Sequence, residues 1–434
     1  MSTAKPTFNL SDQRALVVVI CVSVLFTLSL SMYAARSTIE FLYSGGQTYE
    51  EAISGILATF EEANPDVKVD RIRVQGSYRD KLIALMAAGT VPDVVEVDMH
   101  DIMAFHDERF FYDLAPLAQK TPAYQVQQIA TPMLDMYTVD GKLVAVPSLA
   151  NPSLYVYNVD VFDQSGLAYP ADLYKKNAWT WSAFRDMARK ATRKEADGRF
   201  SVVGASLHLP RTWLFSNGGA EFDDPKRPTQ TFLDSETSLE TMQFLHSMIW
   251  EDQALLPAGR MPAEIGANDE IGFSQGKIGM ASRWISSVPA YGRGASDIGL
   301  VPYPKGPGPH GRYATDLGSW GIAITRQTKD VEAAWRFVSS ITGPAASATW
   351  AKLPGQTPPR PVQLAWLPEK VHNPGIYWDL LSYGTMRVIS RDRLNLQRVI
   401  DAGLNSVWSN MVEPKSALSE ISRQIRAFLK ENPQ

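Results

Sequence analysis

Apolar and polar positions follow two different periods along the first part of the chain. Residues 38–43 (TIEFLY) and 67–74 (VKVDRIRV) are typical of strands, and residues 93–97 form a short apolar run. Residues 47–65 (QTYEEAISGILATFEEANP) and 78–88 place apolar side chains at helical spacing, and the first pattern stops at an Asn-Pro pair. This order of strand, helix, strand, helix and strand predicts a mostly parallel sheet covered by helices.

Polar residues follow the first predicted strand, at a place where such sheets bind ligands. Ligands bind outside the carboxyl ends of the strands in open α/β sheets. The stretch SGGQT, residues 44–48, occupies that position. Ser44, Gly45 and Gln47 are therefore candidate ligand-binding residues.

An acidic turn follows the run at 93–97. Asp98 and Asp101 stand there with His100 between them. Ionised carboxylates can accept several hydrogen bonds from sugar hydroxyls, but Asp is also a common cap of a helix, here one starting at IMAF. Since Asp98 comes directly after a buried strand, we expect its side chain to point into a cleft. His100 is either part of that site or a solvated turn residue.

Residues 15–35 carry no charge over 21 positions and are long enough to cross a hydrocarbon core. Lys5 and Arg14 precede them, which predicts a cytoplasmic tail at 1–14 and an extracytoplasmic remainder. The segment is either a secretory signal or an uncleaved membrane anchor. Cys21, the single cysteine, lies inside it and follows an isoleucine, which disfavours a lipoprotein attachment site. The exported part then has no cysteine for disulfides or thiol catalysis.

Length and charge narrow the class of protein. The chain has 434 residues, 45% hydrophobic and 20% charged, which exceeds the size at which one core keeps growing and predicts two lobes or domains. The formal net charge is -4 and no Lys/Arg run is present. Nucleic acid is therefore not an expected partner.

An ordered set of motifs covers nearly all of the chain from residue 39 to about residue 430. They are FEEANPDVKV, ALMAAGTVPDVVEVD, DGKLVAVPSLANPSLYVYNVDVF, WTWSAFRDMARKAT, SNGGAEF, FSQGKIGMASRW, GLVPYPKGPG and GSWGIAITRQTKDVEAAWRFVSSIT. In this order they resemble extracellular solute-binding proteins of family 1, the maltose-binding-like receptors of ABC importers. The resemblance implies a two-lobed periplasmic-binding-protein-like fold of type II, with a ligand held in the cleft and passed to a membrane permease.

The chain itself offers places for the crossings between lobes. GKLVAVPSLANPSLYVYN is an extended apolar run interrupted by Pro147, Asn151 and Pro152, and we place the first hinge there. IGLVPYPKGPGPHG is a strand with a Pro/Gly-rich end, typical of a return crossing. We therefore assign 37–151 and 304–342 to lobe one, and 152–303 and 343–434 to lobe two.

Aromatic residues supply further candidates. The resemblance brings Trp284 (ASRWIS) and Trp320 (GSWGIA) to the cleft, where a flat ring can pack on a pyranose. The alternative is burial in a core, which we predict for three tryptophans on helical patterns. These are Trp181, Trp250 and Trp335.

The other candidates have equally ordinary alternatives. Asn217 and Gly218 either place donors near a ligand or form a turn in which glycine supplies a positive φ. Arg283 and Arg360 either bind a sugar or an anionic group, or pair with carboxylates. The remaining candidate ligand-binding residues are Asn151 and Trp213.

Catalysis is the competing class of function. GFSQG at 272–276 matches the nucleophile-elbow pattern, which requires a strand before the serine and a helix after it. Here the polarity suggests the reverse order. No zinc-ligand spacing is present, so we expect no metal and no cofactor.

The sequence thus predicts a non-catalytic receptor of an ABC importer that binds a sugar, oligosaccharide or related polyol. The alternatives are a membrane-anchored carbohydrate-active enzyme with paired carboxylates, and a receptor for a phosphorylated polyol.

Overall fold

The computed structural model describes residues 36–257, 260–294 and 297–433. The predicted tail at 1–14 and the hydrophobic segment at 15–35 lie outside these ranges. Within the ranges described, no helix is long and apolar enough to cross a membrane.

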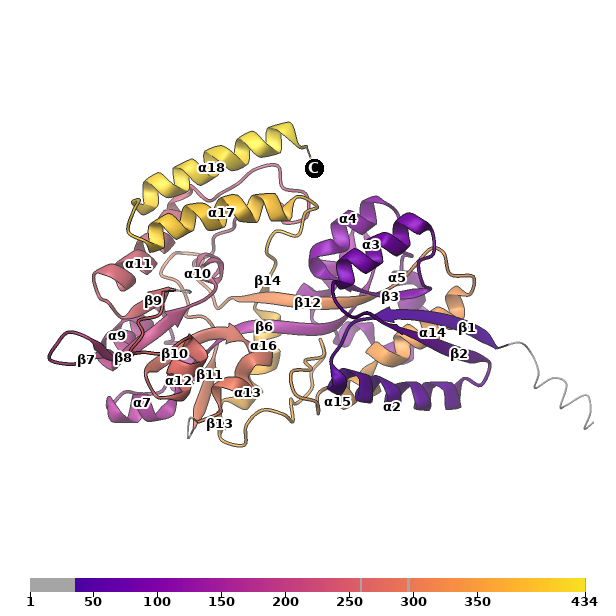
Figure 1. Ribbon diagram of the computed structural model, residues 1–434, viewed down its shortest axis with the longest axis horizontal. Coiled ribbons are helices and arrows are strands. Elements are labelled where there is room, and N and C mark those ends of the chain that lie inside the picture. The colour runs from indigo at the N-terminus through magenta and orange to yellow at the C-terminus, as the bar shows by residue number, and fades with distance from the viewer. Residues whose placement is uncertain (1–35, 258–259, 295–296, 434) are drawn as a thin grey trace, which may run out of the picture.

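Lobe one is built on three parallel strands, which lie on the right in Figure 1. The first strand is central and pairs in parallel with the other two, as the strand and helix pattern predicts. The strands are β1 (Ser37–Tyr43), β2 (Val67–Arg73) and β3 (Val94–Asp98). The helices of this half are α2 (Gln47–Ala63), α3 (Tyr78–Ala88), α4 (Ile102–Asp107), α5 (Ala115–Gln119), α6 (Thr131–Tyr137), α14 (Val331–Thr342) and α15 (Pro344–Trp350).

Lobe two has its own strands and helices. Its longer strands are β8 (Phe200–Leu207), β10 (Ile278–Trp284) and β11 (Ile298–Val301), and its short ones are β7 (Arg193–Lys194), β9 (Leu255–Pro257) and β13 (Val371–His372). The first two pair in parallel. The helices are α7 (Val159–Gln164), α8 (Pro170–Lys175), α9 (Trp181–Ala191), α10 (Pro210–Ser216), α11 (Glu236–Trp250), α12 (Asp269–Ser274), α13 (Val288–Tyr291), α17 (Arg393–Trp408) and α18 (Pro414–Glu431). Helix α16 (Tyr377–Ser382) contacts α6 of lobe one.

Two long strands, β6 (Val146–Asn158) and β12 (Thr315–Ile324), run from one lobe into the other (Figure 1). The first part of β6 pairs with β12, and its second part pairs with β10 and β11. The second part of β12 pairs with β3, while its start pairs with the short strand β14 (Gly384–Thr385). The sheet order β2-β1-β3-β12-β6-β10-β8-β7 is therefore continuous across both lobes.

The first crossing is a continuous strand, although its sequence contains two prolines. Pro147 lies opposite Gly321, where the register of β6 and β12 shifts. Proline cannot donate a ladder hydrogen bond, so it is tolerated at such an irregularity.

The chain after residue 342 first stays with lobe one. Helix α15, which the division by sequence gives to lobe two, contacts α14 and α2. The backbone N–H of Ala150 donates to the carbonyl of Thr357 at 2.7 Å, and that of Ala130 to the carbonyl of Pro359 at 3.1 Å. The chain then reaches β13, which pairs with β11 of lobe two. The structure therefore shows a third passage between the lobes after Pro359.

Candidate ligand-binding cleft

A pocket of about 300 Å³ lies between the lobes, and we name it the aromatic pocket. It is lined by residues at the end of β1, by Glu96 in the middle of β3, by the crossing strands and by α2, α14 and α15, while Ser286 comes from lobe two. Its polar lining consists of Ser44, Glu96, Ser148, Asn151, Ser286 and Gln356, and its aromatic lining of Tyr49, Trp320 and Trp350. Polar groups and flat apolar rings together suit a ligand with hydroxyl groups on an apolar ring.

The end of β1 lies at this pocket, as the strand-end rule predicts. Ser44 and Gly45 line it, and the N–H of Ser44 donates to Oε2 of Glu96 at 2.7 Å. A Cβ on Gly45 would stand 2.5 Å from the ring of Tyr49, so only glycine lets that ring pack here. Gln47, the first residue of α2, is exposed and donates to Glu51; it does not line the pocket.

Glu96 is a pocket residue that the sequence analysis missed. Its side chain is buried and accepts hydrogen bonds from the N–H of Ser44 and the hydroxyl of Tyr49. Burial raises the pKa of Glu96 to about 7, against the lowering effect of these two hydrogen bonds. The carboxyl group can therefore act as donor or acceptor near neutral pH. The available signal was a single carboxyl inside the otherwise apolar run VVEV.

Three aromatic side chains form the apolar part of the pocket. The rings of Tyr49 and Trp350 stack with centroids 5.0 Å apart and an interplanar angle of 21°. Trp320 packs edge-on against Tyr78 at 5.6 Å and keeps part of its surface open. The sequence pointed to Trp320 but not to Tyr49 or Trp350, which are brought together by contacts between α2 and α15.

Asn151 connects the two lobes at the pocket. It lies in β6 opposite Gly318 of β12, and its Oδ1 accepts a hydrogen bond from the N–H of Ser286 at 3.2 Å. The residue predicted to mark the hinge therefore lines the pocket, and its side chain contacts lobe two.

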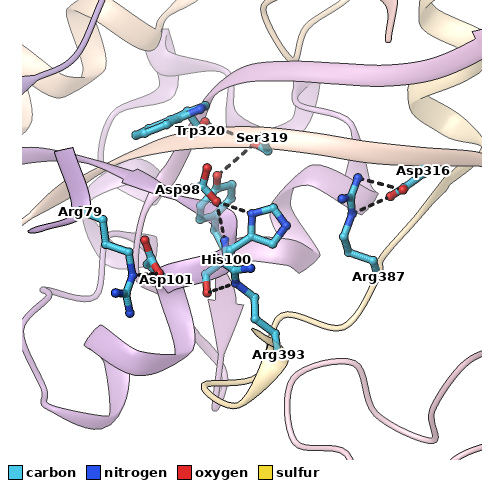
Figure 2. Close-up of polar contacts among 10 residues, drawn as sticks. Arg79, Asp98, His100, Asp101, Asp316, Ser319, Trp320, Arg387 and Arg393 are labelled. Atoms are coloured by element: carbon cyan, nitrogen blue, oxygen red, sulfur yellow. Dashed lines mark hydrogen bonds and ion pairs between the residues drawn. The ribbon is translucent and has the colours of Figure 1, made fainter. Parts of the chain in front are cut away.

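Figure 2 shows the acidic turn after β3, where both carboxylates are engaged locally. Oδ1 of Asp98 accepts from the backbone N–H of His100 at 2.8 Å and lies 2.6 Å from Nδ1 of its ring. Asp98 thus caps the short 3₁₀ helix Met99–Asp101. Burial raises the pKa of Asp98, but the contacts with His100 outweigh it and lower the pKa overall. Asp101 is buried and pairs with Arg79 at 2.8 Å.

Neither carboxylate lines the aromatic pocket. Asp98 lies at the end of β3 as expected, but in this structure its side chain caps a helix, which is the alternative role considered from the sequence. Its contact with a ligand stays a prediction. His100 reaches lobe two, because its carbonyl accepts from Nε of Arg393 at 3.3 Å (Figure 2).

Trp284 lies at the end of β10, two residues before Ser286 of the aromatic pocket. The guanidinium carbon of Arg387 lies 5.1 Å from the centroid of its ring. Arg387 in turn pairs with the buried Asp316, with Nε donating to Oδ1 at 3.0 Å (Figure 2). Arg283 instead pairs with Asp269 and the hydroxyl of Tyr291, so its charge is already matched.

Two other candidates from the sequence are buried inside lobe two. Trp213 is fully buried among aromatic rings such as Tyr155 and Phe184. Asn217 is buried at the end of α10, where it donates to Glu240 and accepts from the N–H of Gly308. These contacts leave Trp213 and Asn217 away from the aromatic pocket.

Gly218 and Arg360 also have structural roles. Gly218 has a φ of +80° and follows α10 in a turn, which is the alternative the sequence analysis left open. Arg360 is buried, and its guanidinium donates to the carbonyls of Tyr124, Gln125 and Thr342. It therefore fixes the backbone of lobe one, and its contact with a ligand stays a prediction.

The predicted core tryptophans divide into two groups. Trp181 and Trp335 are buried, which confirms the prediction for both. Trp250 is 38% exposed because it ends α11 at the surface, so its prediction was wrong.

The GFSQG motif does not form a nucleophile elbow. Ser274 is the last residue of α12, and its hydroxyl donates to the carbonyl of Ile271 at 3.0 Å. Gly276 then turns the chain with a φ of +70° into β10. The order is helix, turn and strand, as the sequence polarity suggested.

Comparison with known proteins agrees with this architecture. A probable amino-acid ABC transporter periplasmic-binding protein of Sinorhizobium fredii is 21% identical over 420 residues, which are 90% of this chain and 89% of the relative. The cyclic α-maltosyl-1,6-maltose-binding protein of Arthrobacter globiformis superposes with a TM-score of 0.75 at 18% identity, over 92% of this chain and 100% of the other. The substrate-binding protein Lmo0181 of Listeria monocytogenes, in complex with cycloalternan, superposes with a TM-score of 0.71 at 19% identity, over 91% of this chain and 99% of the other.

These likenesses confirm the two-lobed periplasmic-binding-protein-like fold that the resemblance implied. The sequence profile of the bacterial extracellular solute-binding proteins matches residues 44–348, which is more than half of the chain. The chain therefore belongs to the family of bacterial extracellular solute-binding proteins.

Proposed function

We propose that this protein captures a sugar, an oligosaccharide or a related polyol in the aromatic pocket and delivers it to the permease of an ABC importer. The observation that carries the proposal is the pairing of the Tyr49–Trp350 stack and Trp320 with the polar groups of Ser44, Glu96 and Asn151 in one interlobe pocket. The similar structures include carbohydrate-binding proteins, which support this ligand class, and the relative from Sinorhizobium fredii is a probable ABC transporter component, which supports the permease as partner.

Ligand capture is coupled to movement of the lobes about β6 and β12. Groups from both lobes line the pocket, with Ser286 on one side and Ser44 on the other. A ligand that contacts both sides shifts the equilibrium toward the closed arrangement. The size of the shift is the difference between its binding free energies for the closed and open arrangements. The protein acts outside the cytoplasm, and residues 15–35 direct its export, as a cleaved signal or as an anchor.

The test uses the chain from residue 36 onward and a panel of neutral mono- and oligosaccharides and polyols. Thermal unfolding reports binding, and chromatography of the same mixtures reports any product. Stabilisation by a member of the panel without product formation supports a receptor. Turnover of a glycan would establish the competing carbohydrate-active enzyme, and no stabilisation by any member would reject the ligand class.

A further inference from the structure

A second pocket of about 220 Å³, which we name the arginine pocket, lies between the lobes. Lobe one contributes His100, and lobe two contributes Arg211, Arg387 and Arg393. Among the described residues that line it, Asp401 is the one carboxylate, so these side chains carry three formal positive charges against one negative charge.

Much of the donor capacity of these arginines is not used by protein groups. A guanidinium has five N–H donors. Arg387 donates through Nε to Oδ1 of Asp316, and its Nη2 lies 2.8 Å from Oδ2 in the same ion pair. Arg393 donates through Nε to the carbonyl of His100. Arg211 donates through Nη2 to Gln397 at 2.8 Å. Nη1 of Arg211 is buried without a hydrogen-bond partner among the described residues, an arrangement that is unfavourable unless an acceptor is supplied.

The acidic groups around the arginine pocket do not supply that acceptor. The nearest oxygen of Glu221 lies 4.0 Å from Nη1 of Arg211, beyond hydrogen-bond distance. Burial raises the pKa of Glu221, against the lowering effect of the Arg211 charge. Asp401 accepts from the amide of Gln397 at 2.7 Å. Asp316 is engaged with Arg387 as described above.

The adjacent helix also favours an anion. Helix α17 begins at Arg393, so the N-terminal end of this 16-residue helix lies at the arginine pocket. The first N–H groups of a helix carry partial positive charge.

We propose that the arginine pocket receives an acidic group, a carboxylate or a phosphate, of the same ligand whose sugar or polyol part occupies the aromatic pocket. Trp284 connects the two sites, because Arg387 packs over its ring and Ser286, two residues later, lines the aromatic pocket. This inference rests on the proposed function and narrows its ligand class to acidic carbohydrates and polyols.

The test compares matched forms of each probe by thermal unfolding and calorimetry. Glucose, galactose and mannose are each used as the neutral sugar, the uronate and the 6-phosphate, together with glycerol, glycerol 3-phosphate and inorganic phosphate. The variant is Arg393→Gln, whose side chain makes a single hydrogen bond to a backbone carbonyl. The matched control is Arg398→Gln, an exposed arginine on the same helix. Unfolding of both variants without ligand checks that they fold.

The expected result is that an acidic form binds more tightly than its neutral counterpart, and that Arg393→Gln weakens this binding about 10- to 100-fold while Arg398→Gln leaves it unchanged. Whether the uronate or the phosphate is preferred identifies the acidic group. The inference is overturned if no acidic form binds better than its neutral form, if Arg393→Gln binds acidic probes normally, or if inorganic phosphate alone stabilises the protein as much as they do. Binding of neutral sugars with no preference for acid would leave the proposed function intact.

Discussion

Replacing Glu96 by Gln should remove most of one pH-dependent contribution to the stability of lobe one. Its pKa is about 7 in the folded protein against 4.5 for an ordinary glutamate. Between these values the folded state binds more protons than the unfolded state, so the free energy of unfolding falls as pH rises. The contribution is fully present below about pH 4.5 and is lost as pH rises through about 7. A shift of this size corresponds to about 3 kcal/mol in total, and to about 2 to 3 kcal/mol between about pH 5 and about pH 8.

Urea unfolding of wild type and Glu96→Gln at a series of pH values measures this difference. The glutamine side chain of the variant does not titrate, and it keeps only one of the two oxygen acceptors that Ser44 and Tyr49 use. The stability of wild type relative to the variant should therefore decline by about 2 to 3 kcal/mol across the range. The matched control is Glu62→Gln, an exposed carboxyl on α2, which should follow wild type. Parallel pH profiles for wild type and Glu96→Gln would refute the reasoning that burial controls this carboxyl.

Three further predictions concern parts outside the aromatic pocket. Arg360→Ala should lower the free energy of unfolding by about 3 to 5 kcal/mol in denaturant titrations, because three backbone carbonyls lose a charged donor in hydrogen bonds that are buried or part-buried; wild-type stability would contradict its structural role. Asp98→Ala should lower stability by about 1 kcal/mol at neutral pH, and the difference should shrink as pH falls below about 4, since a lowered pKa stabilises only the ionised form. A difference that grows in acid would show that the cap is not ionised. If residues 15–35 remain as an anchor, cell fractionation should recover the full-mass protein in membranes, whereas a soluble chain starting near residues 32–37 would show cleavage.

Local patterns were sufficient to predict the elements of lobe one and the crossing at β6. The period of two and the helical spacing show which face of each strand and helix is buried. The sheet order β2-β1-β3 buries those faces. The position of α15 against lobe one could not be predicted from local patterns. Its contacts with α14 and α2 depend on where the chain passes between lobes, and no local period encodes that choice.

Four candidates from the sequence line the aromatic pocket, two just after β1 and two within the crossing strands β6 and β12. Ser44, Gly45, Asn151 and Trp320 line the aromatic pocket because strands carry them there. Trp350 reaches the same pocket through helix packing between distant segments, which single-sequence reasoning does not see.

The roles of the arginines could not be predicted, because the sequence does not distinguish an arginine that faces a ligand from one that donates to a carbonyl. Arg360 is engaged by backbone oxygens and Arg283 by Asp269, whereas Arg211 and Arg393 line an interlobe pocket. Only the hydrogen-bond and ion-pair partners of each guanidinium, which the structure gives, distinguish a structural arginine from one that lines a pocket.

The central claim is that the aromatic pocket binds the ligand, and calorimetric affinity of Trp320→Ala for a glycan that stabilises wild type tests it most directly. The matched control is Trp250→Ala, which removes a partly exposed tryptophan of α11 that does not line the pocket. The account predicts that Trp320→Ala weakens binding by about 10-fold or more while Trp250→Ala binds as wild type does. Unchanged affinity of a folded Trp320→Ala variant would contradict it.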